Sequence, residues 1–210
     1  HAGAVGARIK EKSLVKVMGT STCDIMVSNN PKYNSSTVKG ICGQVNGSVI
    51  PGMTGLEAGQ SAFGDVLAWF KNILEWPLTE IVLHSKVLTH QQKIELQHEF
   101  DHKLIQRLTA SAASIPLEDT LPVALDWING RRTPDANQNL KGAISNINLG
   151  TSAPHLFLSL VLSICFGSKA IVNRFEEEGV EIDQIIGIGG IAKKSSFIMQ
   201  ILADTLNRPV

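Results

Sequence analysis

Three short turns in this sequence combine glycine with small or hydroxyl-bearing residues, and each could bring backbone close to a phosphate or a flat base. They are Gly-Thr-Ser-Thr at 19–22, Glu-Ala-Gly-Gln-Ser at 57–61 and Gly-Ile-Gly-Gly-Ile-Ala at 187–192. A turn with few bulky side chains exposes its N–H groups, and such concave backbone binds anions. A helix that begins after the turn adds unpaired N–H groups and partial positive charge. The indicated chemistry is recognition of a phosphorylated ligand.

Each turn is also compatible with an ordinary structural role. The first could be a plain β-turn, and the second a helix entry made of small residues for packing. The third matches Gly-x-Gly-x-x-Gly/Ala, the dinucleotide fingerprint, but no acidic residue follows about 20 positions later, as that fingerprint requires. The fingerprint also belongs at the first βα turn of a fold, so we do not assign it. No Walker-type Gly-x-x-x-x-Gly-Lys-Ser/Thr motif occurs.

One further motif is a literal His-Glu-x-x-His, formed by His98, Glu99 and His102. Two histidines at this spacing share one helix face and can hold zinc, with the glutamate as a general base. No third ligand follows at a plausible spacing. A solvated helix face accounts for the pattern more simply than a zinc protease does.

Composition restricts the classes of partner. The chain has 210 residues, 43% apolar and 18% charged, with 19 basic and 19 acidic side chains, which is typical of a globular protein without a polyanion-binding face. Nucleic acid is therefore not an expected partner. Cys23, Cys42 and Cys165 are scattered, which predicts neither a disulfide scaffold nor a zinc site and favours a reducing cytoplasm. The apolar stretch 156–166 is too short to span a bilayer, so we expect a core helix and no membrane partner.

The elements around the first two turns follow from hydrophobic spacing. Residues 14–18 and 24–28 are predicted strands of a hairpin, with a polar loop at 29–37 and another strand or two at 45–53. Ser61 is predicted to cap a helix that starts at Ala62 and carries apolar residues at helical spacing, with Asp65 in its first turn.

The second half predicts a polar amphipathic helix at 90–114, a strand at 123–125 and a polar loop at 126–138. Ser152 and Pro154 indicate the start of a long apolar helix. A strand at 184–188 then leads through the third turn to a last helix capped by Ser195 or Ser196. We expect one α/β domain with the helices after Pro77 as an insertion.

Taken together, these segments resemble the FGGY carbohydrate kinases, and two of them are typical of the ribulokinase branch of that family. The segments follow the family's order and are 1–7, 18–23, 55–65, 126–134 and 189–196, the third and fourth being the more specific. The resemblance implies an actin-like, ribonuclease-H-like lobe with a mixed sheet flanked by helices. Residues 1–210 would be the C-terminal, nucleotide-binding lobe of a two-lobed kinase whose sugar-binding N-terminal lobe is absent.

The resemblance also assigns site residues. It places Gly19, Thr20 and Ser21 by the ATP phosphates. It sets two residues of the second turn, Gly59 and Phe63, along the nucleotide. On the adenine side it places the backbone of Gly189, Gly190 and Ile191, with Lys194 or its neighbour Lys193 edging the base. Glu57 is similar to a residue that reaches into the sugar site.

The implied reaction moves the γ-phosphoryl group of Mg-ATP to the 5-hydroxyl of L-ribulose, as in L-arabinose catabolism. The family's base is an aspartate two residues before the histidine that matches His1, so no catalytic base is expected within this chain. The implied ligands are ATP or ADP, Mg²⁺ and a pentulose sugar, and a homodimer is an open possibility.

Two alternatives stay open. One is another FGGY kinase that acts on a related pentulose, which the sugar lobe would decide. The other, from a different class, is a non-catalytic nucleotide switch of the actin and Hsp70 type. The segments 55–60 and 129–134 are typical of kinases and favour the enzyme.

Overall fold

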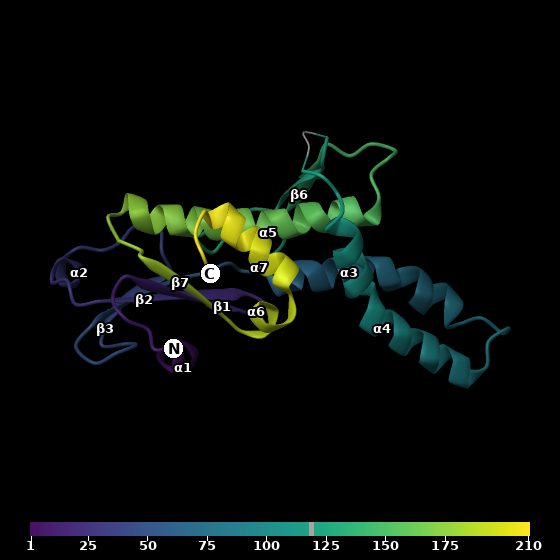
Figure 1. The fold of residues 1–210 in the computed structure, drawn as a ribbon, viewed down its shortest axis with the longest axis horizontal. Helices are drawn as coiled ribbons and strands as arrows, with labels where there is room; N and C mark the ends of the chain where they lie inside the picture. Colours follow the sequence, from purple (N-terminus) through teal and green to yellow (C-terminus); the bar gives the residue numbers. More distant parts are fainter. Residues whose placement is uncertain (118–119) are drawn as a thin grey trace.

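A five-stranded mixed sheet lies at the centre of the computed structural model, which describes residues 1–117 and 120–210 (Figure 1). The strand order is β3 (Gly43–Asn46), β4 (Thr54–Ala58), β2 (Thr22–Ser28), β1 (Ser13–Met18) and β7 (Gln184–Ile188). β1 pairs antiparallel with β2 and parallel with β7, and β4 pairs antiparallel with both β2 and β3. The sheet therefore combines four antiparallel strands with one parallel edge strand.

Helices cover one face of this sheet and extend beyond one end of it. In Figure 1, α5 (Ala153–Glu177) runs along the sheet with α7 (Ser196–Leu206) against it. The chain leaves β4 through α3 (Gly64–Pro77) and the π-helix η1 (Leu78–Val82), and it returns through α4 (His90–Ala112). α3 and α4 project past the sheet as a helical hairpin (Figure 1).

The remaining elements are short. They are α1 (Ala2–Gly6), α2 (Lys32–Ser35), β5 (Val123–Leu125), β6 (Ala143–Ser145) and α6 (Gly190–Lys194). β5 and β6 form a separate two-stranded sheet that packs beside α5. α1 supplies Ala4 to a small cluster with Val15 and Ile25, on the sheet face that α5 does not cover.

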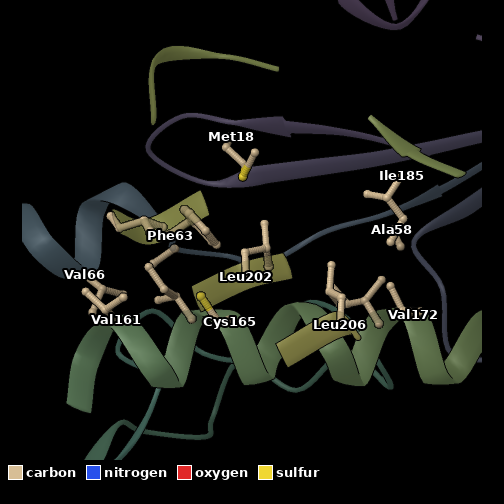
Figure 2. Close-up of a cluster of buried hydrophobic side chains, with 14 of the residues drawn as sticks. Met18, Ala58, Phe63, Val66, Val161, Cys165, Val172, Ile185, Leu202 and Leu206 are labelled. Atoms are coloured by element: carbon tan, nitrogen blue, oxygen red, sulfur yellow. The ribbon is translucent and has the colours of Figure 1, made fainter. Parts of the chain in front are cut away.

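The main core lies between the sheet and α5, and Figure 2 shows side chains from both layers meeting there. Met18 and Ala58 point from the strands toward Cys165 and Leu202 on the helices, and Phe63 fills the space beside them with no exposed surface (Figure 2). Alternate residues of a strand point to opposite faces. Leu56 and Ala58 therefore face this core, whereas Glu57 between them faces the other side.

α5 is the one helix among the described residues that is long and apolar enough to cross a membrane by length and composition. In this fold it is a core helix, because twelve of its residues are buried against the sheet and α7. Two of its buried serines, Ser159 and Ser163, donate to the carbonyls of Leu156 and Leu160, so they are satisfied within the helix. The expectation of a core helix at 156–166 is confirmed.

Most predicted elements are present, including the hairpin, the amphipathic helix, the strands 123–125 and 184–188, and the cap at Ser195, whose Oγ accepts from Ile198 N. Two predictions are wrong. The strand expected at 45–53 ends at Asn46, and β4 begins only at Thr54. Ser61 does not cap a helix: α3 begins at Gly64, and the buried Ser61 Oγ has no partner among the described residues.

One buried ion pair joins the hairpin strands on the core side. Lys16 and Asp24 are directly opposite in the register, and Lys16 Nζ donates to both carboxylate oxygens at 2.8 and 2.9 Å. Their side chains are 3% and 0% exposed. Removing one partner of a buried pair leaves an uncompensated charge, which costs more than the pair contributes.

We therefore expect Asp24→Ala to lower the free energy of unfolding by about 3–5 kcal/mol, measured by urea denaturation. The double variant Lys16→Met, Asp24→Leu should recover much of that loss, because neither charge is then buried. Lys103→Gln, which breaks an exposed pair with Glu99, should leave the unfolding curve almost unchanged. An Asp24→Ala curve that overlays the wild type would contradict the stabilising role of the pair.

Candidate nucleotide site

A cavity of about 680 Å³ opens where the β1–β2 turn, α3, α4 and the α6–α7 segment meet. Cavities of this size suit small-molecule ligands. The β1–β2 turn contributes Gly19 and Thr20, and the α6–α7 segment contributes residues from Gly190 to Ile198. Segments far apart in the sequence therefore converge on one site.

The β1–β2 turn is docked on the first turn of α3 by backbone hydrogen bonds. Phe63 N donates to Thr20 O at 2.7 Å, Gly64 N to Gly19 O at 3.0 Å, and Asp65 N to Thr20 O at 3.0 Å. The first N–H groups of a helix have no partner within the helix, and here the turn carbonyls satisfy them instead of a side-chain cap. A Cβ at Gly64 would lie 2.6 Å from Gly19 O, so only glycine permits this approach.

The same docking leaves other donors of the turn available. The carbonyls of Gly19 and Thr20 point to α3, and Gly19 N bonds to Ser21 O at 3.0 Å. Within the described residues, the N–H groups of Thr20 and Ser21 donate no hydrogen bond to the protein. Free backbone N–H groups beside the Thr20 hydroxyl form the kind of concave turn that binds an anion.

The opposite part of the cavity is built by the third turn. Gly189 has φ +106°, and a Cβ there would lie 2.3 Å from Met18 O, so this glycine lets the turn cross the end of β1. A Cβ at Gly190 would meet nothing within 4 Å. Gly190, Ile191 and Lys194 line the cavity, whereas Lys193 does not.

α3 and α4 provide the facing walls. Leu67 and Ala68 come from α3, while Ile105, Gln106 and Thr109 come from α4. Ile191 and these aliphatic side chains make the lining largely apolar, with polar groups such as the Gln106 amide and the Lys194 ammonium among them. Mostly apolar walls with some polar groups are typical of small-molecule sites.

Five of the nine residues predicted to bind ATP line the cavity. Gly19, Thr20, Gly190, Ile191 and Lys194 share the cavity. The other four, Ser21, Gly59, Phe63 and Gly189, do not line it. Phe63 is fully buried in the core, with Lys16 Nζ 6.0 Å from its ring centroid. Gly59 packs on the backbone of Thr22, where a Cβ would lie 2.2 Å from the carbonyl oxygen.

After the second turn, four residues at the start of α3 line the cavity, namely Gly64, Asp65, Leu67 and Ala68. Local spacing does not identify them, because it starts the helix at Ala62, about half a turn early. The α4 residues are also absent from the predicted site, since a polar helix inserted after Pro77 gives no local sign of a contact with the turns. The one sequence feature that relates two of these α4 residues is the four-residue spacing of Ile105 and Thr109, which puts both on the same face of the helix.

Glu57 lies outside the cavity, in a separate polar cluster. Its carboxylate accepts from Arg132 Nη2 at 2.7 Å and lies 3.6 Å from His1 Nε2. The Cys23 thiol donates to the same carboxylate at 3.5 Å, and burial, followed by the charge of Glu57, raises the pKa of Cys23 to about 11. Cys23 is therefore a neutral thiol at neutral pH. The role of Glu57 in sugar binding stays a prediction.

Residues 14–210 match the C-terminal domain of the FGGY family of carbohydrate kinases. The chain belongs to that family. It is 48% identical to the ribulokinase of Vibrio parahaemolyticus over 212 residues and 34% identical to that of Geobacillus thermodenitrificans over 211. Both comparisons cover all of this chain but only 36% and 34% of those proteins. The chain thus spans about a third of the length of these relatives.

Solved FGGY kinases share the fold. A xylulose kinase from Rhodospirillum rubrum superposes with a TM-score of 0.74 at 19% identity, covering 99% of this chain and 36% of that one. A Plasmodium falciparum glycerol kinase with ADP gives 0.65 at 16% identity, again covering 99% and 36%. At such identities the likeness shows the fold alone. The predicted α/β, actin-like lobe is confirmed.

In this FGGY domain, Gln60 holds the loop 126–134 against α5. Its Nε2 donates to Asp126 Oδ2 at 2.7 Å and to Ile164 O at 2.9 Å, and its Oε1 accepts from Ser168 Oγ at 2.7 Å. Burial raises the pKa of Asp126, and the hydrogen bond from Gln60 partly opposes that shift. The same loop carries Arg132, so this network positions the partner of Glu57.

Two glycines that line the cavity, Gly64 and Gly190, should differ in how much an added methyl group lowers stability. We expect Gly64→Ala to lower the free energy of unfolding by about 1–3 kcal/mol, since overpacking against the Gly19 carbonyl displaces the docked turn. Gly190→Ala should leave stability nearly unchanged, because its Cβ enters open cavity space. Thermal unfolding followed by circular dichroism measures both.

Measuring ADP binding distinguishes a change in the cavity wall from a loss of stability. Gly190→Ala should weaken binding while the protein stays as stable as the wild type. Equal loss of stability in both variants would show that the docked turn and the open cavity wall are wrongly placed.

Proposed function

We propose that this chain is the nucleotide-binding lobe of an ATP-dependent sugar kinase that phosphorylates L-ribulose at its 5-hydroxyl. The observation that carries the proposal is the cavity shared by the β1–β2 turn and the Gly190–Lys194 helix, within an FGGY domain. The choice of sugar is supported by relatives at 48% and 34% identity that are named ribulokinase. The free cysteines among the described residues support a reducing, cytoplasmic setting.

The cavity suggests how the nucleotide lies. The base would sit between Ile105 of α4 and Ile191 of α6, with Lys194 at its edge. The phosphates would extend toward Thr20, whose hydroxyl and free backbone N–H can donate to them. Phosphoryl transfer depends on positioning and on stabilising charge at the transferred group. This lobe would supply the positioning and part of the charge stabilisation.

A magnesium ion fits the same lining. Among the described lining residues, Asp65 supplies the one carboxylate. Magnesium in kinase sites is held by one or two carboxylates together with phosphate oxygens and water, so an ion bound mainly through the nucleotide matches this donor set. Asp65 would hold the ion through a carboxylate oxygen or an intervening water. When bound, the ion would neutralise charge on the phosphates.

The sugar would be approached from the other sheet face. Glu57, held by Arg132, is a half-buried carboxylate that can accept hydrogen bonds from sugar hydroxyls. We propose that the base that deprotonates the attacking hydroxyl lies outside these 210 residues, in the part that the longer relatives have in addition. A placed carboxylate is the usual base for such a step.

For the chain by itself, we expect weak binding of Mg-ADP, visible in calorimetry as a shallow isotherm. With one wall of a two-lobed site, the phosphates stay in water, where charge interactions are several-fold weaker. Ile105→Asp should abolish even this binding because it places a charge on the base wall. Ile94→Asp is the matched control, since Ile94 is an exposed residue of the same helix outside the cavity.

A sub-micromolar dissociation constant for the wild-type chain would contradict the proposal that this lobe forms only one wall of the nucleotide site. Equal loss in the Ile94 and Ile105 variants would contradict the placement of the base.

Kinase activity should require more than this chain. In a coupled assay of ADP release, we expect no L-ribulose-dependent signal from the 210 residues alone. We expect activity from a chimera in which they replace the matching part of the Vibrio parahaemolyticus ribulokinase, because 48% identity should preserve the contact between the lobes. Glu57→Gln in the chimera should raise KM for the sugar far more than KM for ATP.

Turnover by the short chain alone would place the base within it. A chimera that phosphorylates another pentulose in preference to L-ribulose, while the parent enzyme does not, would assign a sugar-selective role to this lobe.

A further inference from the structure

α4 carries two exposed histidines one helical turn apart, and their rings meet. His98 and His102 place their Nε2 atoms 3.0 Å apart. Their ring centroids are 4.2 Å apart, and the planes cross at 63°. One ring therefore donates an Nε2–H to the unprotonated Nε2 of the other, because two protonated nitrogens would repel. The two Nε2 atoms thus face each other on the exposed side of the helix.

A metal held by both Nε2 atoms needs both lone pairs to point at the same place. The two rings must therefore turn out of their mutual hydrogen bond before a metal can bind. Histidines at this spacing share one helix face and can reach the same metal ion. Imidazole nitrogens with water in the other positions suit the square-planar or tetragonal coordination that Cu²⁺ and Ni²⁺ prefer.

We propose that His98 and His102 form a two-imidazole site for Cu²⁺ or Ni²⁺, with water in the remaining positions. Binding requires both rings to carry their proton on Nδ1, so the ring that now donates through Nε2 shifts its proton to Nδ1. No covalent bond between heavy atoms of the protein changes. The two histidines lie outside the nucleotide cavity, and metal binding to them does not require the proposed kinase function.

The neighbouring carboxylates leave the remaining coordination positions to water. Asp101 pairs with Lys71 of α3, and Glu99 pairs with Lys103 at 2.7 Å. Within the described part of the chain, no group of three or more His, Cys, Asp or Glu side chains could hold a metal ion. The arrangement therefore lacks both the free glutamate base and the third ligand of a zinc protease, but it retains the chelating pair.

A bound metal would clamp two successive turns of α4. The stripe His98, His102 continues one turn on to Gln106, which lines the nucleotide cavity. Ligand binding to the folded state stabilises the structure that it requires. We therefore expect slower amide exchange in α4 around 98–106 when the metal is bound.

Calorimetric titration of the chain with Cu²⁺ tests the site, and electron paramagnetic resonance of the one-to-one complex identifies its ligands. We expect tetragonal signals with nitrogen hyperfine structure from two imidazoles. His98→Gln and His102→Gln should each weaken binding at least tenfold. His90→Gln, on the same helix but outside the pair, should leave the affinity unchanged, and circular dichroism should show equal helix content in all variants.

Two further control variants distinguish the His98–His102 pair from the remaining copper ligands of the chain. The variant His102→Gln, Lys103→His keeps two histidines but moves them to a spacing of five residues, so it should bind as weakly as His102→Gln alone. His1→Gln removes the imidazole beside the terminal amine, a competing copper ligand, and should keep the one-to-one site. Loss of that site on changing His1, or full affinity at the altered spacing, would overturn the proposal.

Metal choice and pH give independent readouts. Zn²⁺ should bind more weakly than Cu²⁺, because divalent metals bind nitrogen ligands in that order, and zinc binding tighter than copper would contradict a site made of two imidazoles and water. Affinity should fall as the pH is lowered, because protons compete with the metal for its imidazole ligands. Binding that does not depend on pH would exclude histidine ligands.

Discussion

The hydrogen bonds between the start of α3 and the carbonyls of Gly19 and Thr20 fix the geometry on which the candidate site depends. They satisfy helix donors that would otherwise need a cap. They also orient the turn, so that its free N–H groups and the Thr20 hydroxyl lie at the cavity. Gly64 makes the approach possible, because a side chain there would meet the Gly19 carbonyl. The hairpin and the helix thus form one rigid corner of the site.

The candidate nucleotide cavity and the charged pair Glu57–Arg132 lie at different parts of the sheet. Residues of β4 alternate between the core shared with α5 and the opposite face, which puts Leu56 and Ala58 in the core and Glu57 on the other side. The nucleotide cavity lies at the end of the sheet beside the helical hairpin, whereas the Glu57–Arg132 pair lies across the strands from it. The two candidate regions are therefore separate within the described part of the chain.

The sequence was sufficient for those features that depend on local pattern. The hairpin 14–28, the core helix 153–177 and the turn at 187–192 follow from alternation, apolar length and glycine, and the structure contains all three. The start of α3 could not be predicted locally, because its capping partners are carbonyls more than 40 positions earlier in the chain. Spacing also did not predict that the Phe63 side chain is buried in the core. Ile105 lines the cavity only because α4 folds back toward the β1–β2 turn, and local spacing in the sequence does not specify that arrangement.

The helical hairpin of α3 and α4 has a consequence for how such proteins diverge. Its outer part, from η1 to the start of α4, is largely solvent-exposed, with residues such as Val87 at 90% exposure, and few contacts there constrain the length or composition of the chain. The inner end of the same hairpin supplies Ile105 and Gln106 to the cavity wall. A change of length near the exposed tip can therefore shift α4 and, with it, the cavity wall at the other end of the hairpin.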